Sequence, residues 1–406
     1  MPITKIKCCN FKSFKDLDVS FGDFNVLIGP NASGKSNLVQ VFKFLRDIGE
    51  YGLDNAISMQ GGAEYLRNAG TKSNIKLSLD VEGKPHNGNN IRHLPFLNPI
   101  KISYRFNLNF EDNKVSIDYD ELIVDFSIRK RRTKKTKSES PDKGRIVMSN
   151  VKGKLSVKVE PDDERIKEIK SFLKYVIKNE SKEMSNKLML EVNVIFRILA
   201  GNFLRGIALY DFDPKLPKRS VAFGGKVQLE ENSTNLSIVL KRIIENDKEK
   251  RKLSNLVRDI LPFVSDLGIN KLADKSLLFN LKENYYKDSL PSSLLSDGTV
   301  NIMSLIVAIF FENNEMVIIE EPEKNIHPYL ISKIMDMAKE ASSKKQIILT
   351  THSPQIVQNA GLENLLLVSR DENGFSSVTR PFKKKEVKDF LKNELGVEDL
   401  FINNYL

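Results

Sequence analysis

The chain has 406 residues, of which 40% are hydrophobic and 29% are charged, a balance typical of a soluble globular protein with two or three domain-sized units. Its longest apolar run, residues 302–311, is too short to cross a bilayer, so no membrane partner is expected. The net charge is +10, and residues 129–137 alone supply +7 of it. The excess positive charge is therefore a property of one local patch and not of the whole surface.

The only cysteines are the neighbours Cys8 and Cys9, whose side chains would point to opposite faces of a strand. This pair excludes a disulfide framework and favours reduced thiols. The first residues also lack the apolar core of a secretory signal. We therefore expect a cytoplasmic location.

The first 50 residues predict strands followed by one helix. Apolar residues alternate at positions 17, 19 and 21, as they do on a half-buried strand. Residues 24–28 form a short apolar run of the kind found in fully buried strands. From Leu38 to Ile48 the apolar residues then follow helical spacing.

The rest of the chain changes character twice. Residues 74–160 alternate strongly and predict a β-rich segment, whereas residues 162–182 and 235–264 have the spacing of helices with charged faces. The C-terminal part returns to alternating strands and helices, which predicts a largely parallel sheet covered by helices and hence an α/β fold. Its strands are expected at residues 316–320, 346–350 and 364–368.

Residues 29–36, Gly-Pro-Asn-Ala-Ser-Gly-Lys-Ser, match the phosphate-binding loop and stand between a buried strand and a helix. Glycines let the backbone wrap around phosphate groups, and the helix that follows adds the positive end of its dipole. Lys35 would reach the β- and γ-phosphates of ATP, and the Ser36 hydroxyl would bind Mg²⁺. The residues expected to contact ATP here are Gly29, Pro30, Asn31, Ala32, Ser33, Gly34, Lys35, Ser36 and Asn37.

Adjacent carboxylates end the apolar run at residues 316–320. Such a strand delivers them to the same edge of the sheet as the phosphate loop. Because neighbours on a strand point in opposite directions, the two acids are expected to have different roles. We assign Glu320 to Mg²⁺ and Glu321 to activation of the attacking water. Alone, an acidic strand end is also compatible with a solvated strand terminus.

Two further segments belong to this pattern. His352 follows another apolar strand and would arrive at the same edge, where it would sense the γ-phosphate of ATP and assist catalysis. Ser296 and Asp297 precede an apolar helix and are candidates for its N-cap. Helix capping and phosphate recognition use the same free N–H groups, so the segment with Ser296 and Asp297 is compatible with both roles.

These motifs, in this order, resemble the ABC-type ATPases of the RecF/SMC/OLD kind, in a standalone form. The resemblance covers both ends of the chain, residues 1–70 and 286–406, which would together form the ATPase head with a mixed sheet. Residues 71–160 would continue the head as a β-rich segment with a basic hairpin, and residues 161–285 would be a mainly helical insertion. The matching segments are residues 10–15, 28–37, 295–299, 320–328 and 351–354.

The resemblance implies a homodimer that forms around two ATP molecules. Ser296 and Gly298 of one subunit would face the γ-phosphate held by the other, and Asn325 would lie in the loop that communicates across the dimer. Lys12 would approach the nucleotide phosphates.

The chain departs from the family pattern in several places. The strand acid is Glu320 where many relatives have Asp, so its contact with Mg²⁺ is expected to differ. No glutamine stands where the family's glutamine loop would follow the central strands, and Gln60 is a weak candidate for it. Relatives of the OLD kind carry a C-terminal Toprim nuclease, but only 54 residues follow His352 here, so nuclease activity is not expected in this chain.

The basic run at residues 129–137 stands between two strand-like segments and is expected to form the tip of a β-hairpin. It is compatible with a solvated loop or with contacts to the phosphate backbone of a nucleic acid. The basic residues are Arg129, Lys130, Arg131, Arg132, Lys134, Lys135 and Lys137.

The preferred hypothesis is an ATP-binding and ATP-hydrolysing switch that dimerises head to head. It would act on DNA, or with a separately encoded nuclease or effector, in genome maintenance or phage defence. One alternative is the ATPase subunit of a transporter, which the long insertion and the missing glutamine loop disfavour. Another is a nucleotide-binding scaffold with little turnover, which the presence of Glu321 and His352 disfavours.

Overall fold

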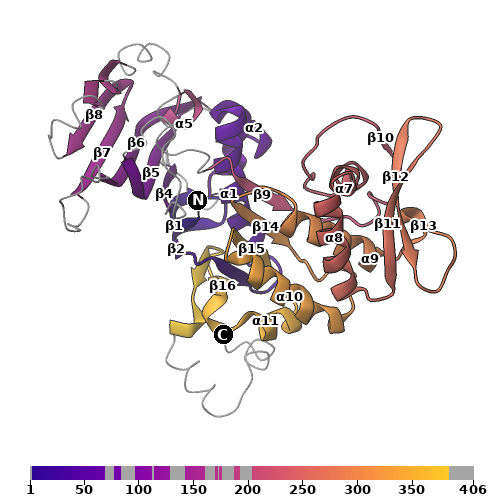
Figure 1. Cartoon of the computed structure of the whole chain (residues 1–406). Coiled ribbons are helices and arrows are strands. Elements are labelled where there is room, and N and C mark those ends of the chain that lie inside the picture. The colour runs from indigo at the N-terminus through magenta and orange to yellow at the C-terminus, as the bar shows by residue number, and fades with distance from the viewer. Residues whose placement is uncertain are drawn as a thin grey trace, which may run out of the picture. The chain divides into compact units, whose positions relative to one another are not determined.

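The computed structural model (Figure 1) describes most of the chain. The chain folds into two compact units, and each unit contains segments that are far apart in the sequence. Unit 1 comprises Met1–Gly22, Ala32–Ile207 and Val368–Thr379, and unit 2 comprises Asp23–Asn31, Ala208–Leu367 and Arg380–Leu406. The described residues are 2–68, 77–83, 97–111, 114–128, 142–160, 170–171, 173–175, 187–192 and 204–383.

A seven-stranded antiparallel sheet forms the centre of unit 1, in the order β2-β1-β4-β5-β6-β7-β8. Each strand pairs with its neighbour along most of its length, and β1 pairs with β4 although a long stretch of sequence separates them. The strands are β1 (Ile3–Phe11), β2 (Phe14–Ser20), β4 (Leu77–Gly83), β5 (Leu97–Glu111), β6 (Lys114–Ile128), β7 (Asp142–Val151) and β8 (Lys154–Glu160).

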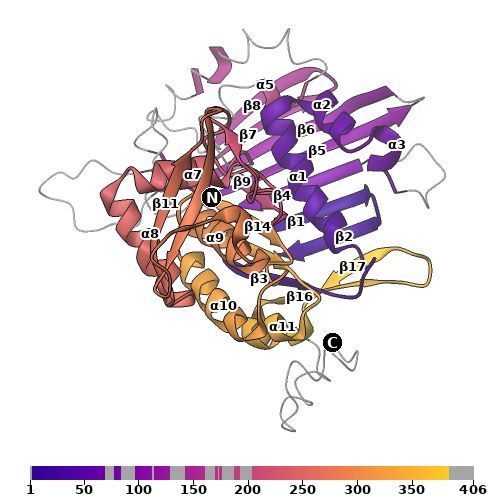
Figure 2. The ribbon, with the colours of Figure 1, turned by 90° about the vertical axis from the view of Figure 1, so that its right-hand side faces the viewer.

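The long helix α1 (Lys35–Tyr51) packs its apolar side against this sheet. The rings of Phe11 on β1 and Phe44 on α1 lie 5.9 Å apart, and those of Phe21 and Phe42 lie 5.4 Å apart. Figure 2 shows α1 and the shorter α2 (Leu53–Met59) across the sheet face. Unit 1 also contains α3 (Ala63–Leu66) and α5 (Met189–Val192). The predicted helix at residues 38–48 is thereby confirmed.

In unit 2 the central sheet is mainly parallel. The order of its six strands is β17-β16-β3-β15-β14-β9, and β16 runs from unit 2 into unit 1, where β17 follows it. The strands are β3 (Phe24–Ile28), β9 (Ile207–Tyr210), β14 (Met316–Glu320), β15 (Gln346–Thr350), β16 (Leu365–Arg370) and β17 (Ser376–Thr379). The expected strands at 316–320 and 346–350 are confirmed, and the third begins one residue later than expected.

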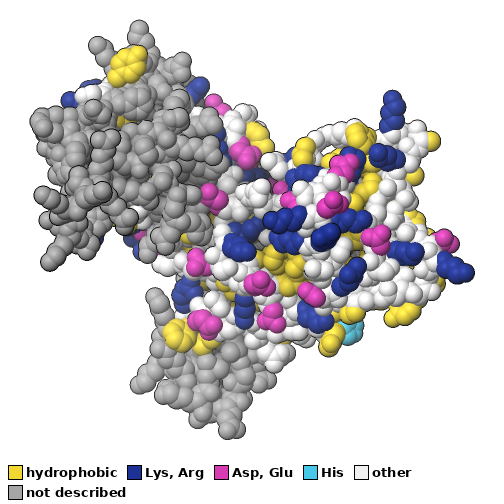
Figure 3. Space-filling model, in the orientation of Figure 1, with side chains coloured by type: hydrophobic (Ala, Val, Ile, Leu, Met, Phe, Trp, Pro, Cys, Tyr) yellow, Lys and Arg dark blue, Asp and Glu magenta, His cyan; other side chains and the backbone are white. Residues whose placement is uncertain are grey.

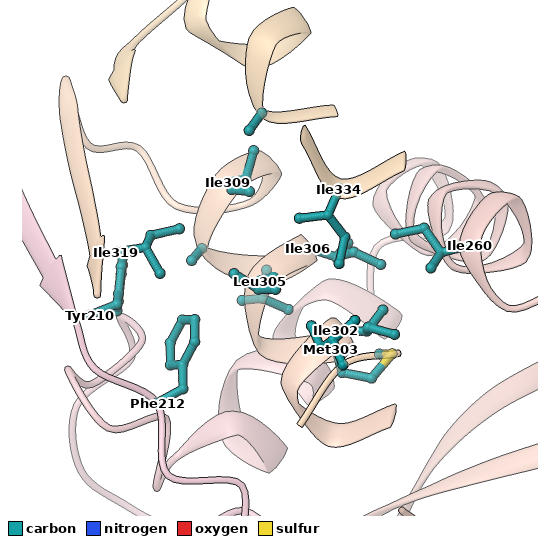
Figure 4. Close-up of a cluster of buried hydrophobic side chains, with 14 of the residues drawn as sticks. Tyr210, Phe212, Ile260, Ile302, Met303, Leu305, Ile306, Ile309, Ile319 and Ile334 are labelled. Atoms are coloured by element: carbon teal, nitrogen blue, oxygen red, sulfur yellow. The ribbon is translucent and has the colours of Figure 1, made fainter. Parts of the chain in front are cut away.

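The core of unit 2 lies around α9 (Asp297–Phe310), which is buried on nearly all sides. Ile302 and Ile306 of α9 lie beside Ile260 and Ile334, as Figure 4 shows. These two partners belong to α8 (Asp247–Ile260) and α10 (Pro328–Ser342), and α11 (Pro354–Ala360) is part of the same unit. An all-round apolar helix has no solvent face, so α9 is held in place by packing along most of its length.

The remaining part of unit 2 pairs two helices with a small antiparallel sheet. Helix α8 buries Leu253, Val257 and Ile260, and Figure 3 shows Lys and Arg side chains gathered on the surface over it. Helix α7 is Leu236–Ile244, and the strands are β10 (Val221–Ala222), β11 (Val264–Lys271), β12 (Ser276–Glu283) and β13 (Leu290–Pro291).

Residues 161–285, which were expected to be mainly helical, therefore also contain strands β9 to β12. The pairing of β11 with β12 brings Lys271 opposite Leu277, across the turn at residues 272–275. This is a hairpin pattern, and two short strands of this kind are easily overlooked beside two strongly amphipathic helices. The opposite orientation of the two cysteines is confirmed, since Cys8 is buried and Cys9 exposed.

A buried acid makes the stability of unit 1 depend on pH. Asp120 on β6 accepts a hydrogen bond from the Met189 backbone N–H at 2.5 Å. Burial, opposed in part by the hydrogen bonds from Met189 and Tyr104, raises the pKa of Asp120 from 3.8 to about 7. Between these two values the folded protein holds a proton that the unfolded chain has released, so the free energy of unfolding falls as the pH rises.

Asp120→Asn should therefore stabilise the protein at about pH 8, by on the order of 2–4 kcal/mol, and much less at about pH 5. Denaturant unfolding of both forms at the two pH values measures this. Asp118→Asn, a more exposed carboxylate on the same strand, is the control. Equal stability differences at both pH values would contradict the role of the Asp120 proton.

Candidate functional site

Three loops of the chain begin at one edge of the parallel sheet. Strand β15 lies between β14 and β3, and Thr350 is in register both with Glu320 and with Leu27. Since all three strands run in the same direction, the residues that follow them leave from the same edge. The loops that begin with Gly29, Glu321 and Thr351 are the three motifs identified in the sequence. The sheet thus brings together what the chain separates by up to about 320 residues.

The phosphate-loop segment connects β3 in unit 2 to α1 in unit 1, crossing between the units at Ala32. Ala32 and Gly34 adopt left-handed backbone conformations, with φ of 60° and 113°. Such a backbone turns successive N–H groups toward the inside of the loop, where they can bind an anion. Gly34 is the N-cap of α1, with no side-chain cap and no acidic residue in the first helical turn. The N-terminal end of α1 is therefore suited to a phosphate group.

Side chains from other segments of unit 1 fix this loop. The Ser376 hydroxyl lies 2.6 Å from the Ser33 carbonyl oxygen, which accepts a hydrogen bond from it, and 2.8 Å from the Ser13 hydroxyl. A Cβ at Gly34 would collide with the Ser376 side chain, so no larger residue fits there without a shift. Glycine is thus required at position 34 both by its φ angle and by this close approach.

Lys12 lies in the tight turn between β1 and β2. Its φ is 48°, and its N–H donates to the Leu66 carbonyl at 2.9 Å. The next residue, Ser13, accepts a hydrogen bond from the Asn37 side chain in the first part of α1 at 2.7 Å. Burial lowers the pKa of Lys12. The structure therefore brings Lys12 and Asn37, both expected at the nucleotide, to neighbouring places in unit 1.

Glu321 does not continue strand β14. Its φ is 46°, and its N–H donates to the Thr350 carbonyl at 2.9 Å, so the chain turns sharply immediately after Glu320. One carboxylate oxygen of Glu321 lies 3.1 Å from His352 Nδ1, and the other lies 3.3 Å from Lys324 Nζ. The two residues expected to take part in catalysis, Glu321 and His352, are in direct contact. The side-chain alternation of a strand, from which the separate roles of the two acids were argued, ends at Glu320.

Sequence reasoning did not identify the positive partner of Glu321. Lys324 Nζ also lies 2.9 Å from Asp211 Oδ1, so one ammonium group joins two carboxylates. Lys324 stands three residues after Glu321, which is a local signal, but Asp211 lies 110 residues away and no pattern marks it.

Thr351 and Glu323 form a second contact between the loops. The Thr351 hydroxyl donates to Glu323 Oε1, and the Thr351 N–H donates to the Leu27 carbonyl of β3 at 3.0 Å. Among the described residues, Glu323 Oε2 has no hydrogen-bond partner. Burial raises the pKa of Glu323, and the Thr351 hydrogen bond opposes that shift. These contacts connect the loop after β14 to β15 and β3.

The loop after β14 also packs against the first turn of α9. Ser296 is the N-cap of α9 and accepts a hydrogen bond from the Thr299 N–H at 3.1 Å. The Asn301 side chain donates to the Lys324 carbonyl at 2.6 Å. A Cβ at Gly298 would lie 2.5 Å from the Asn325 carbonyl oxygen. Ser296, Gly298 and Asn325, which were all expected at a dimer interface, therefore lie together in one unit.

Ser36 and Glu320 remain the candidates for Mg²⁺. A hydroxyl and a carboxylate are the oxygen ligands that Mg²⁺ prefers, and neither side chain is fully buried. The described part of the chain contains no group of three or more His, Cys, Asp or Glu residues that could hold a metal ion.

The basic run at residues 129–137 lies outside the described residues. The strands on either side of it, β6 and β7, pair antiparallel, with Ile128 opposite Asp142. Gln60, the weak candidate for the glutamine loop, ends α2 and is buried in unit 1.

Comparison with known proteins places these features in a wider group. The family described as AAA ATPase domain matches residues 1–357. The Septu protein PtuA of Bacillus thuringiensis is 29% identical over 90 residues, which are 21% of this chain and 23% of that protein. An uncharacterized protein of Methanocaldococcus jannaschii is 22% identical over 480 aligned positions, covering 100% of this chain and 56% of that protein. The chain thus spans only part of both relatives.

Among solved structures, an SMC head bound to the C-winged helix domain of ScpA is similar to this chain, with a TM-score of 0.55. The sequence identity is 14%, and the match covers 93% of this chain and 97% of that one. The likeness shows that the fold is that of an ABC-type head, as expected from the motifs. No described helix is long and apolar enough to cross a membrane.

The contact between Gly298 and the Asn325 carbonyl yields a prediction. Gly298→Ala places a methyl group 2.5 Å from that oxygen, so the loop after β14 or the first turn of α9 must shift. We expect a loss of stability of about 1–3 kcal/mol, the usual effect of overpacking. Gly224→Ala, at a position where an added Cβ meets nothing within 4 Å, is the matched control. Thermal unfolding of the two variants checks this, and equal melting temperatures would contradict the close packing.

Proposed function

The chain belongs to the AAA ATPase domain family, and from that premise we propose that it binds and hydrolyses ATP as a switch that closes head to head with a second copy. The observation that carries the proposal is the contact between Glu321 and His352, 3.1 Å apart at the edge from which the phosphate loop also starts. A carboxylate beside an imidazole at a phosphate-binding edge suits activation of a water molecule.

In this proposal the phosphate loop and Lys35 hold the β- and γ-phosphates, and Ser36 and Glu320 hold Mg²⁺. The ion, when bound, neutralises charge on the phosphate oxygens. Glu321 accepts a proton from the attacking water, and His352 orients Glu321 and meets the γ-phosphate. Thr351 and Glu323 keep the loops in register, since they connect the ends of β14, β15 and β3. Catalysis then comes from positioning and from stabilisation of charge.

The second copy would complete each site. Ser296 is exposed at the N-terminus of α9, where free N–H groups suit a γ-phosphate held by the partner. Leu294 is 70% exposed and Tyr329 71%, and each stands next to one of these loops in the sequence. Large apolar side chains that are exposed beside a polar site are typical of a surface that another protein covers. Asn325 would then carry changes at one site to the other through its contact with Gly298.

A scaffold with little turnover is the second candidate, and one observation favours it. Lys324 shares its charge between Glu321 and Asp211, and an ammonium group held against the base opposes proton transfer to that base. In the switch, closure of the dimer releases this contact. In the scaffold, the contact persists and ATP remains bound. Both the switch and the scaffold would act on DNA, or on a separate nuclease or effector, in genome maintenance or phage defence. The resemblance of the motifs supports this part of the proposal.

Glu321→Gln tests the switch. It should keep ATP binding and lower the hydrolysis rate by about 10²–10⁴, because the base can no longer accept a proton. The uncleaved ATP should hold the closed dimer, which doubles the mass seen by light scattering. Glu340→Gln, at an exposed position on α10, is the control.

Lys35→Ala should remove ATP binding and dimerisation together. If Glu321→Gln hydrolyses ATP as the native chain does while Glu320→Gln traps the dimer, the roles of the two acids are reversed. If the native chain binds ATP with no measurable turnover, the scaffold is the better description.

Salt dependence tests action on DNA. Each neutralised phosphate contributes roughly −0.9 to the slope of log K against log salt concentration, where K is the binding constant for DNA. If about half of the basic run contacts phosphates, this slope should be about −3. Changing Arg131, Arg132, Lys134 and Lys135 to Ser should flatten this slope by about two units and weaken binding similarly for all sequences, because phosphate contacts carry no base information. ATP turnover without DNA should not change. Unaltered affinity and slope would identify the run as a solvated loop and favour a protein partner.

A further inference from the structure

The first residue of α9 carries a charge that the proposed function does not use. Asp297 follows the N-cap Ser296, and its side chain is 37% exposed. A carboxylate in the first turn stabilises a helix, because it lies beside the positive end of the helix dipole. In the proposed switch, however, the same end of α9 meets the γ-phosphate of ATP bound to the second copy. Two negative groups would then lie close together, and their repulsion opposes closure.

Lys218 supplies a positive charge at this place. Its ammonium group forms an ion pair with a carboxylate oxygen of Asp297, 79 residues further along the chain. Among the described residues, Asp297 forms an ion pair with no other cation. Only 21% of the Lys218 side chain is exposed, so the surrounding residues hold most of it in a defined position. The carboxylate at the start of α9 is therefore neutralised by one lysine.

The turn that carries Lys218 is itself attached to the segment that leads into α9. The Leu216 N–H donates to the Asp213 carbonyl at 3.1 Å, which closes the turn. The Pro217 carbonyl accepts a hydrogen bond from the buried Ser292 hydroxyl at 3.2 Å. An ordinary ion pair between two solvated side chains has no such support and contributes little to stability. This lysine is instead held where it controls the charge at the start of α9.

The pair would matter most when the proposed dimer closes. Closure would remove water from the first turn of α9, and the screening of Asp297 would weaken. An unpaired carboxylate would then be buried beside a phosphate, which is strongly unfavourable, whereas a carboxylate that keeps its lysine adds little net charge. In a single chain the first turn stays in contact with solvent, and salt screens either charge. Closure therefore depends on the pair, and binding of ATP to one chain does not.

We propose that Lys218 is a positioning residue that neutralises Asp297, so that the N-terminus of α9 can accept the γ-phosphate of ATP held by the second copy. The inference rests on the proposed function and deepens it, because it names the residue that sets the charge of the closing surface. Lys218 acts through Asp297 and makes no contact of its own with the nucleotide.

Light scattering of the full chain with a non-hydrolysable ATP analogue, adenylyl imidodiphosphate, tests this. Lys218→Ala should raise the dissociation constant of the dimer about tenfold or more, because Asp297 is left unpaired. Adding Asp297→Asn to Lys218→Ala should restore dimerisation to within about threefold of the native chain, since no carboxylate remains to be neutralised. Asp297→Asn alone should dimerise at least as well as the native chain. Lys215→Ala removes an exposed cation of the same turn and is the matched control.

The outcomes separate the role of Lys218 from the proposed function. Failure of the native chain to dimerise with the analogue overturns the switch itself. If the native chain dimerises, three results overturn the role of Lys218: full dimerisation of Lys218→Ala, a double variant as weak as Lys218→Ala, or weakening by Asp297→Asn alone. A merely structural ion pair predicts no rescue, because removing its second partner restores nothing.

Calorimetric titration at protein concentrations below those at which the dimer forms supplies a second readout. All variants should bind the analogue as single chains within about twofold of the native affinity, since Lys218 lies outside the phosphate loop. A loss of this affinity in Lys218→Ala would overturn the inference. If Lys218→Ala does not fold, Lys218→Met, which keeps most of the length and the apolar stem of the side chain, replaces it in the single and the double variant.

Discussion

The parallel pairing of β14, β15 and β3 is the constraint on which the rest of the site depends. Because Glu320, Thr350 and Leu27 share one register, a shift of any of these strands would separate the loops that follow them. The cost of such a shift is high, since all three strands are buried and each apolar side chain has a defined place in the core. The sheet fixes the positions of the loop starts, and the loops are free to carry polar chemistry.

Beyond that edge, polar contacts decide the geometry. The left-handed turn at Glu321 redirects its carboxylate to His352 and Lys324, and the same loop packs through Asn325 against Gly298. A movement of α9 would therefore be transmitted to the proposed catalytic base through backbone contacts only a few residues long. In the proposed switch, this short connection would couple closure of the dimer to hydrolysis.

The sequence predicted the parallel sheet, its α/β class and the motif-bearing loops, because apolar runs and glycine-rich turns are local signals. It did not predict Asp211 as a partner of Lys324, or the strands β11 and β12 within the segment expected to be helical. The first is a contact between residues 113 apart, and only folding brings them together. The expectation that Glu320 and Glu321 alternate assumed a strand that in fact ends at Glu320, where a left-handed turn follows.

Buried polar groups with open hydrogen-bonding positions have different explanations in different parts of this protein. Asp120 and Glu323 each leave one carboxyl oxygen without a partner among the described residues and bond through the other. Burial raises the pKa of both, so each acid can lower the cost of burial by holding a proton. The amide of Gln60 has no such route, because it does not titrate and both of its polar atoms are open. The buried amide of Gln60 is therefore a cost to the folded state that neither a proton nor a described partner offsets.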